Sequence, residues 1–126
     1  MPAGQPAVVW VVDDVESVRK SIAAALEAAG LAVRDYGSAR AFLSDFESGT
    51  RGCLVLDYNM PEMSGLELMQ KLVTEGSLPP TIVITGHGSK AIEERLRAAG
   101  ALTVLDKPVD ADELIAVIAR TLPGTS

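Results

Sequence analysis

The chain has 126 residues, of which 48% are hydrophobic and only 4% aromatic, so it can form a single domain with an aliphatic core. Its formal net charge of −6 argues against direct binding to nucleic acid, because contacts with phosphate groups need clustered Lys and Arg residues. No apolar stretch is long enough to span a membrane, and residues 1–6 lack the apolar segment of a signal peptide. We therefore expect a cytoplasmic protein that does not engage a membrane.

Short apolar runs alternate along the chain with segments of helical periodicity. Five runs are predicted to be strands buried on both sides: Ala7–Val12, Ala32–Tyr36, Cys53–Asp57, Thr81–Thr85 and Leu102–Leu105. The stretches between them are predicted to be helices with apolar stripes, formed by Val18, Ile22 and Leu26, by Phe42, Leu43 and Phe46, by Leu66, Met69 and Val73, by Ile92 and Leu96, and by Leu114, Val117 and Ile118. Five consecutive strand–helix units predict a parallel sheet with helices on both faces. The single cysteine, Cys53, lies within an apolar run and is expected to be a buried thiol.

Several residues mark where these helices begin and end. Ser38 is expected to cap the second helix, and Asp110 with Glu113 resembles the capping box that opens a helix. Three helices are expected to stop at or near a glycine: Gly30, Gly76 and Gly100. We expect residues 7–122 to form the domain, with 1–6 as an N-terminal tail and 123–126 as a C-terminal tail or the start of a linker.

Charged residues follow three of the predicted strands. Asp13 and Asp14 come after the first strand, Asp57 ends the third, and Lys107 follows the fifth. The carboxyl ends of parallel strands share one crevice, so we expect these side chains to meet there. Three carboxylates stay ionised together only if a cation joins them, and an all-oxygen site suits Mg²⁺ or Mn²⁺. With one lysine opposite, the arrangement predicts a site for a phosphoryl group, with an aspartate as the nucleophile.

Five segments carry a resemblance to a known family: Val11–Asp14, Asp57–Pro61, Ser64–Gly65, Val83–Gly88 and Asp106–Pro108. In order, spacing and strand context, they resemble the receiver domain of two-component response regulators over essentially the whole chain. The segments Thr85–Gly88 and Ser38–Leu43 look most like the FixJ-like subgroup. The resemblance implies an α/β, flavodoxin-like receiver fold, with a doubly wound five-stranded parallel sheet of order 2-1-3-4-5 and five helices.

The resemblance also implies a role for each residue of the acidic site. Asp57 is expected to be the phosphoacceptor. Asp14, Asp57 and the main-chain carbonyl of Asn59 are expected to bind Mg²⁺ or Mn²⁺ directly, and Asp13 through a water molecule. Lys107 is expected to contact the phosphoryl oxygens. Taken singly, an aspartate after a strand is more often a turn or cap residue, and only the combination favours a functional site.

Further roles fall on the residues around this site. Thr85 is expected to donate its hydroxyl to the phosphoryl group and so to report the modification. Asn59, Gly86 and His87 are expected to tune the lifetime of the acyl phosphate, with Gly86 leaving room beside it. By the same resemblance, the bond between Lys107 and Pro108 is expected to be cis.

The sequence departs from the family pattern at the switch position. Val104 stands where many receivers have Tyr or Phe, so no rotating aromatic ring is available there. Val15 stands where related receivers often have Glu or another polar residue, and Val109 stands where Phe is common. We hypothesise that the fourth helix and the loop leading into it, residues 86–99, carry the signal instead.

The resemblance implies a protein that is not a turnover enzyme, but promotes its own phosphorylation and dephosphorylation. Its expected partner is a sensor histidine kinase or a histidine phosphotransfer protein, and the phosphorylated form is expected to dimerise through the fourth and fifth helices. Transcription would be controlled by an output domain that this chain does not contain. The alternative is a receiver-fold interaction module that works without phosphorylation. A haloacid dehalogenase-type phosphatase is disfavoured by Asn59, which stands where those enzymes need a second aspartate, and a flavin-binding protein by the acidic loop at Asp13 and Asp14.

Overall fold

The computed structural model describes residues 7–86 and 88–122, so the predicted tails at 1–6 and 123–126 lie outside the described residues. The strands are β1 (Val8–Val12), β2 (Ala32–Tyr36), β3 (Gly52–Asp57), β4 (Thr81–Thr85) and β5 (Ala101–Asp106). The helices are α1 (Glu16–Ala28), α2 (Ala39–Asp45), α3 (Gly65–Thr74), α4 (Lys90–Ala98) and α5 (Ala111–Thr121). Every predicted strand is present, and no strand end differs from the prediction by more than one residue.

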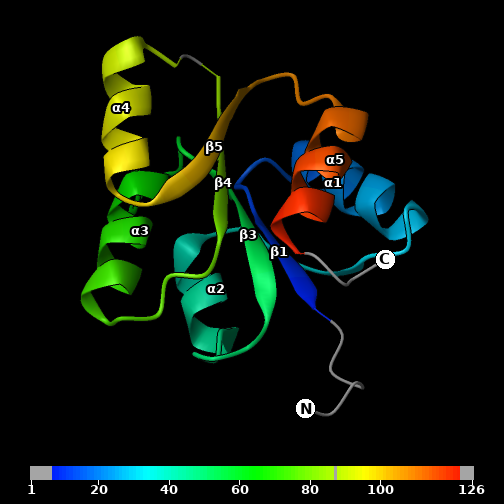
Figure 1. Ribbon diagram of the computed structural model, residues 1–126, viewed down its shortest axis with the longest axis horizontal. Helices are drawn as coiled ribbons and strands as arrows, with labels where there is room; N and C mark the ends of the chain where they lie inside the picture. The colour runs from blue at the N-terminus through cyan, green and yellow to red at the C-terminus, as the bar shows by residue number, and fades with distance from the viewer. Residues whose placement is uncertain (1–6, 87, 123–126) are drawn as a thin grey trace.

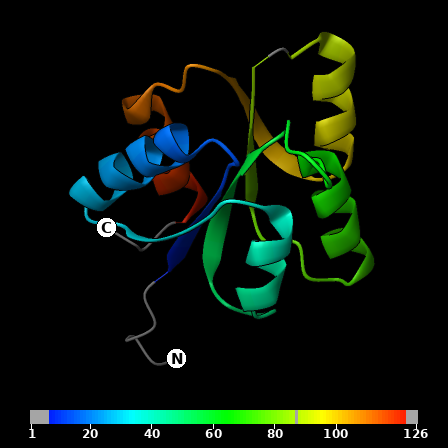
Figure 2. The same ribbon diagram turned by 180° about the vertical axis from the view of Figure 1, so that it is seen from behind.

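The five strands form one parallel sheet in the order β2-β1-β3-β4-β5, which confirms the predicted topology. Helices α1 and α5 cover one face, and α2, α3 and α4 cover the other (Figure 1). The view from behind shows the same division into three layers (Figure 2). The carboxyl ends of β1, β3, β4 and β5 all lie in the upper half of Figure 1, so residues at these strand ends come together there.

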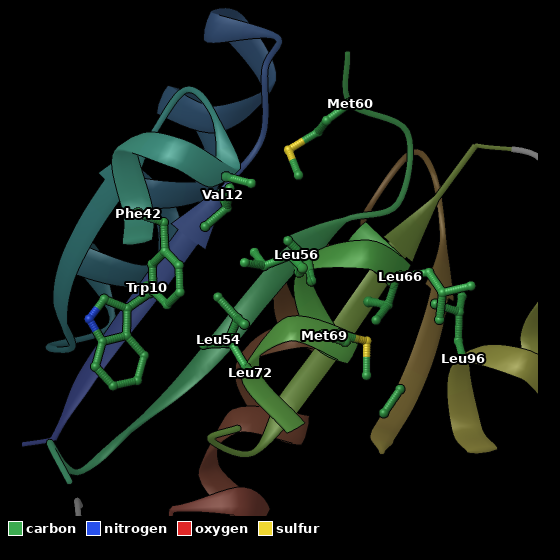
Figure 3. Close-up of a cluster of buried hydrophobic side chains, with 14 residues drawn as sticks. Trp10, Val12, Phe42, Leu54, Leu56, Met60, Leu66, Met69, Leu72 and Leu96 are labelled. Atoms are coloured by element: carbon green, nitrogen blue, oxygen red, sulfur yellow. The ribbon is translucent and has the colours of Figure 1, made fainter. Parts of the chain in front are cut away.

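Because successive side chains of a strand point to opposite faces of the sheet, the strands contribute to two hydrophobic cores. Val9 and Val11 of β1 face α1 and α5, whereas Trp10 and Val12 face α2, α3 and α4. The second of these cores is drawn in Figure 3, with Trp10 near Phe42 at one end and leucine and methionine side chains at the other. Burying these apolar side chains supplies the main driving force for folding. It also holds the strand ends at a fixed separation.

The prediction of burial on both sides holds for the central strands but is wrong at the sheet edges. All residues of β3 and β4 are buried, whereas no residue of β2 is fully buried and Leu102 of β5 is 51% exposed. Edge strands have a neighbour on one side only, which leaves them partly open to solvent. Val73 was expected in the buried stripe of α3 but is 50% exposed, because it lines a groove between α3 and α4.

The predicted cap at Ser38 and the helix-ending glycines are confirmed, whereas of the expected capping box at Asp110 and Glu113 the described contacts include only the N-cap bond. Ser38 Oγ accepts a hydrogen bond from the Ala41 amide at 3.0 Å, and Asp110 Oδ1 accepts one from the Glu113 amide at 3.1 Å. Three glycines with positive φ follow the ends of helices: Gly30 at 92°, Gly76 at 71° and Gly100 at 118°. In addition, α3 opens with a capping box between Ser64 and Glu67. No helix in the described part of the chain is both long and apolar enough to cross a membrane.

Cys53 is fully buried in β3, as predicted, and burial raises the pKa of its thiol to about 12. A thiol with so high a pKa stays protonated near neutral pH and is unreactive. Cys53 therefore serves as a small core residue.

Candidate functional site

Three aspartates lie at the carboxyl edge of the sheet. Asp13 and Asp14 are in the loop between β1 and α1, and Asp57 is the last residue of β3, which pairs with β1. One carboxylate oxygen from each of the three lies within 4.8 Å of the others. Asp13 and Asp57 are each only 2% exposed, whereas Asp14 is exposed. Two of the three carboxylates are therefore buried, and the Asp14 carboxylate lies at the solvent-exposed rim of the site.

A single lysine from the neighbouring loop faces these carboxylates. Lys107 Nζ lies 3.3 Å from Oδ1 of Asp57 and 3.6 Å from Oδ2 of Asp13. The Lys107 amide donates a hydrogen bond of 2.9 Å to the carbonyl of Thr85, which ties the lysine to the end of β4. The cation is therefore held opposite the acidic pair by main-chain contacts as well as by charge.

The environment of Asp57 makes its charged form costly. Burial, followed by the negative charge of Asp13, raises the pKa of Asp57 to about 6. The positive charge of Lys107 and the hydrogen bond donated by the Asn59 amide, at 3.3 Å, act in the opposite direction. One lysine does not offset the whole acidic set, so the site is short of positive charge.

The donor atoms fit a small divalent cation. Oδ2 of Asp57 and Oδ2 of Asp13 are buried and have no hydrogen-bond partner among the described residues. Unsatisfied buried carboxylate oxygens are costly unless a ligand completes them. With Asp14 at the rim, the donors are all oxygen atoms, as Mg²⁺ prefers. The three aspartates can therefore hold a metal ion.

Thr85 and two glycines form the third side of the site. Thr85 ends β4 and is fully buried. A Cβ atom on Gly88 would lie 2.9 Å from the Thr85 Cγ2 atom, so the loop packs directly on this side chain. Among the described residues, a Cβ atom on Gly86 would meet only Lys107 Cδ, at 3.9 Å, so there is room at that position. His87 lies outside the described residues.

The remaining predicted positions lie around this centre. Asn59 is exposed in the loop after β3, two residues beyond Asp57. Val104 pairs with Val83 in the sheet and packs, half-buried, against the core beneath α4. The peptide bond between Lys107 and Pro108 is cis.

One residue at this site was not identified from the sequence. Arg19, in the first part of α1, donates a hydrogen bond of 2.9 Å to the main-chain carbonyl of Asp13. Its other partner is Asp35, on β2. The only sequence signal is a basic residue one turn into the helix that follows the acidic pair, and a surface helix commonly carries such a residue.

Comparisons with known proteins show similarity over most of the chain. A family model described as the response regulator receiver domain matches residues 9–119. The transcriptional regulatory protein FixJ of Azorhizobium caulinodans is 42% identical over 122 residues, which cover 97% of this chain and 57% of that protein. The response regulator protein TodT of Pseudomonas putida F1 is 36% identical over 115 residues, covering 91% and 51%. The chain spans about half the length of the curated relatives it matches.

Solved structures show the same similarity. A crystal structure described as FixJ-N superposes with a TM-score of 0.82 and 39% identity, covering 95% of this chain and 96% of that one. The response regulator StyR superposes with a TM-score of 0.86 and 38% identity, covering 93% of this chain and 59% of that one.

Proposed function

Because the chain belongs to the response regulator receiver domain family, as its motifs indicated, we propose that it accepts a phosphoryl group on Asp57 and thereby switches its protein contacts. One observation carries this proposal. Among the described residues, the buried Asp57 carboxylate has an oxygen without a hydrogen-bond partner, beside Lys107 and two further aspartates. A nucleophile, a fixed cation and a place for a metal ion thus lie within a few ångströms of one another.

The proposed step is transfer from a phosphohistidine. An Asp57 oxygen attacks phosphorus and forms a P–O bond, while the P–N bond to the donor imidazole breaks and the imidazole leaves with the bonding electrons. With a pKa of about 6, Asp57 is mainly ionised near neutral pH, as a nucleophile must be. Lys107 lies where its charge can neutralise the phosphoryl oxygens.

We also propose that phosphorylation requires a divalent metal ion bound at the acidic site. Asp14, Asp57 and the main-chain carbonyl of Asn59 would hold Mg²⁺ or Mn²⁺, with Asp13 contributing through a water molecule. When bound, the ion offsets negative charge on the phosphoryl oxygens. The exposed position of Asp14 leaves this side of the site open to solvent and to a phosphodonor.

After transfer, we assign the readout to Thr85, whose hydroxyl would bind the new phosphoryl group. Thr85 packs against Gly88, and α4 begins two residues later, so movement of the threonine would reach that helix directly. With Val104 at the switch position, this route needs no rotating aromatic ring. Asn59, Gly86 and His87 would tune the lifetime of the acyl phosphate, which the domain itself would form and hydrolyse.

The proposed donor is a sensor histidine kinase or a histidine phosphotransfer protein in the cytoplasm. The names of the relatives describe transcriptional regulators, and this chain corresponds to about half their length. We assign residues 7–122 to the receiver domain. Residues 1–6 would then be an N-terminal tail, and residues 123–126 a C-terminal tail or the start of a linker. Control of transcription would be exerted by a further domain, and copies of the phosphorylated receiver would meet through α4 and α5.

The test is intact mass spectrometry after incubation with Mg²⁺ and acetyl phosphate. The wild-type chain is expected to gain one phosphoryl group, and EDTA is expected to abolish the gain. Asp57→Asn is expected to gain none, whereas neutralising an exposed carboxylate with Glu94→Gln leaves the reaction intact. An unmodified wild-type chain that also fails to bind Mg²⁺ would contradict the proposal. That result would favour an interaction module that works without phosphorylation, for which the aliphatic Val104 is the specific argument.

A further inference from the structure

The main chain at the acidic pair is held by a side chain from α1. Arg19 Nη1 donates its 2.9 Å hydrogen bond to the carbonyl oxygen of Asp13, and its Nε donates a second, also 2.9 Å, to Oδ2 of Asp35. The Arg19 side chain is only 14% exposed. It lies so close to Gly37 that a Cβ atom there would be 3.1 Å from Nη1. Arg19 therefore has little freedom to move away from Asp13.

Asp13 is constrained on its other sides as well. Its amide donates a hydrogen bond of 3.1 Å to the carbonyl of Tyr36, and its Oδ1 accepts one of 2.9 Å from the Val15 amide. Oδ2 is the oxygen left for the site, 3.6 Å from Lys107 Nζ. With one carboxylate oxygen already engaged, the placement of the main chain decides where Oδ2 lies.

We infer that Arg19 is a positioning residue for the divalent-cation site. By joining the Asp13 carbonyl to Asp35 on β2, Arg19 holds the loop so that the Asp13 and Asp14 carboxylates meet Asp57. The inference rests on the proposed function, since it requires that the acidic site binds a cation. Arginine suits this task because its planar guanidinium presents several donors in fixed directions and can bridge two acceptors. Mutating a residue that holds a metal ligand in place commonly weakens metal affinity by about ten- to a hundredfold.

A plain ion pair with Asp35 is the competing explanation, and the chain supplies a matched control for it. Lys20 Nζ lies 2.9 Å from the same Asp35 oxygen, but the Lys20 side chain is 59% exposed. Among the described residues, Lys20 has no hydrogen bond to Asp13. Removing either cation therefore takes one positive charge from Asp35, and only the loss of Arg19 releases the Asp13 carbonyl.

The experiment measures metal binding without phosphorylation. Free Mn²⁺ is titrated into the wild-type chain, Arg19→Met and Lys20→Met, and the unbound ion is quantified by electron paramagnetic resonance. Arg19→Met is expected to raise the Kd for Mn²⁺ by about tenfold or more, whereas Lys20→Met changes it by less than about twofold, as expected for an exposed ion pair. Urea unfolding in EDTA is measured beside it, to show that both variants are folded before metal is added.

The outcomes separate the inference from the function on which it rests. Equal Kd values for Arg19→Met and the wild type would overturn the inference alone, as would equal weakening in both variants. A wild-type chain that binds no Mn²⁺ would overturn the proposed function as well. If Arg19→Met does not fold, Arg19→Lys serves instead, because it keeps the charge but not the bridging geometry. Arg19→Lys is expected to bind Mn²⁺ more weakly than the wild type, and unchanged binding would refute the positioning role.

Discussion

Neutralising the phosphoacceptor is expected to stabilise the metal-free protein. The folded-state pKa of Asp57, about 6, is above its ordinary value of 3.8, so the fold favours the protonated form. The protonated Asp57 carboxyl therefore contributes to the free energy of unfolding, and this contribution is fully present at low pH and is lost as the pH rises through 6. Asp57→Asn mimics the neutral carboxyl at every pH, so its free energy of unfolding does not decrease in this way.

The expected size follows from the same shift. A difference of about two pH units between the folded and ordinary pKa values corresponds to about 3 kcal/mol at pH 7. The gain in the free energy of unfolding should shrink to about 1 kcal/mol near pH 4.5, where the wild-type carboxyl is largely protonated in the folded state. The side chain is buried, so solvent does little to weaken the effect.

Urea unfolding in EDTA at the two pH values measures both quantities. Glu94→Gln is the control, because it neutralises an exposed carboxylate and should change the free energy of unfolding by less than about 0.5 kcal/mol. This prediction is refuted if Asp57→Asn is no more stable than the wild type at pH 7. It is equally refuted if the gain does not diminish as the pH falls.

Three further predictions concern the surroundings of the site. Lys107→Met removes the cation 3.3 and 3.6 Å from the two buried carboxylates, so phosphorylation by acetyl phosphate should slow by at least about tenfold; an unchanged rate in a mass-spectrometric time course would contradict this. Gly88→Ala places a Cβ atom 2.9 Å from the neighbouring threonine methyl, and should lower the free energy of unfolding by about 1–3 kcal/mol, whereas Gly86→Ala, with its nearest contact at 3.9 Å, should cost less than half as much. Equal urea midpoints for these two variants would show that the loop does not pack on the threonine as described. Glu62 has a φ of 72°, so Glu62→Gly should relieve left-handed strain and raise the free energy of unfolding by about 0.5–1 kcal/mol, and a lower urea midpoint would argue against such strain.

Much of the fold was predictable because local and global signals agree. The short apolar runs, the glycines after the helices and the alternation with amphipathic segments each indicate a parallel sheet covered on both faces. The strand order came from the family resemblance rather than from periodicity. The proximity of Asp13, Asp14 and Asp57 was predictable as well, since parallel strands bring their carboxyl ends to one edge.

Other features could not be predicted because they depend on contacts between distant segments. The bond from Arg19 to Asp13 requires knowing that β2 places Asp35 beside the same guanidinium. Val73 fits the apolar period of α3, yet it is exposed because α4 leaves a groove at that point.

The capping box between Ser64 and Glu67 did have a local signal, a serine followed three residues later by a glutamate, and it was overlooked.

In the proposed reaction, Asp57 itself forms the acyl phosphate. Borohydride reduces an aspartyl phosphate to homoserine, so the most direct measurement is peptide mass spectrometry of the chain after treatment with Mg²⁺, acetyl phosphate and borohydride. We expect homoserine at position 57, and an intact aspartate there when EDTA is present. Homoserine at position 13 or 14, or a phosphoryl group that survives borohydride on a hydroxyl side chain, would contradict it.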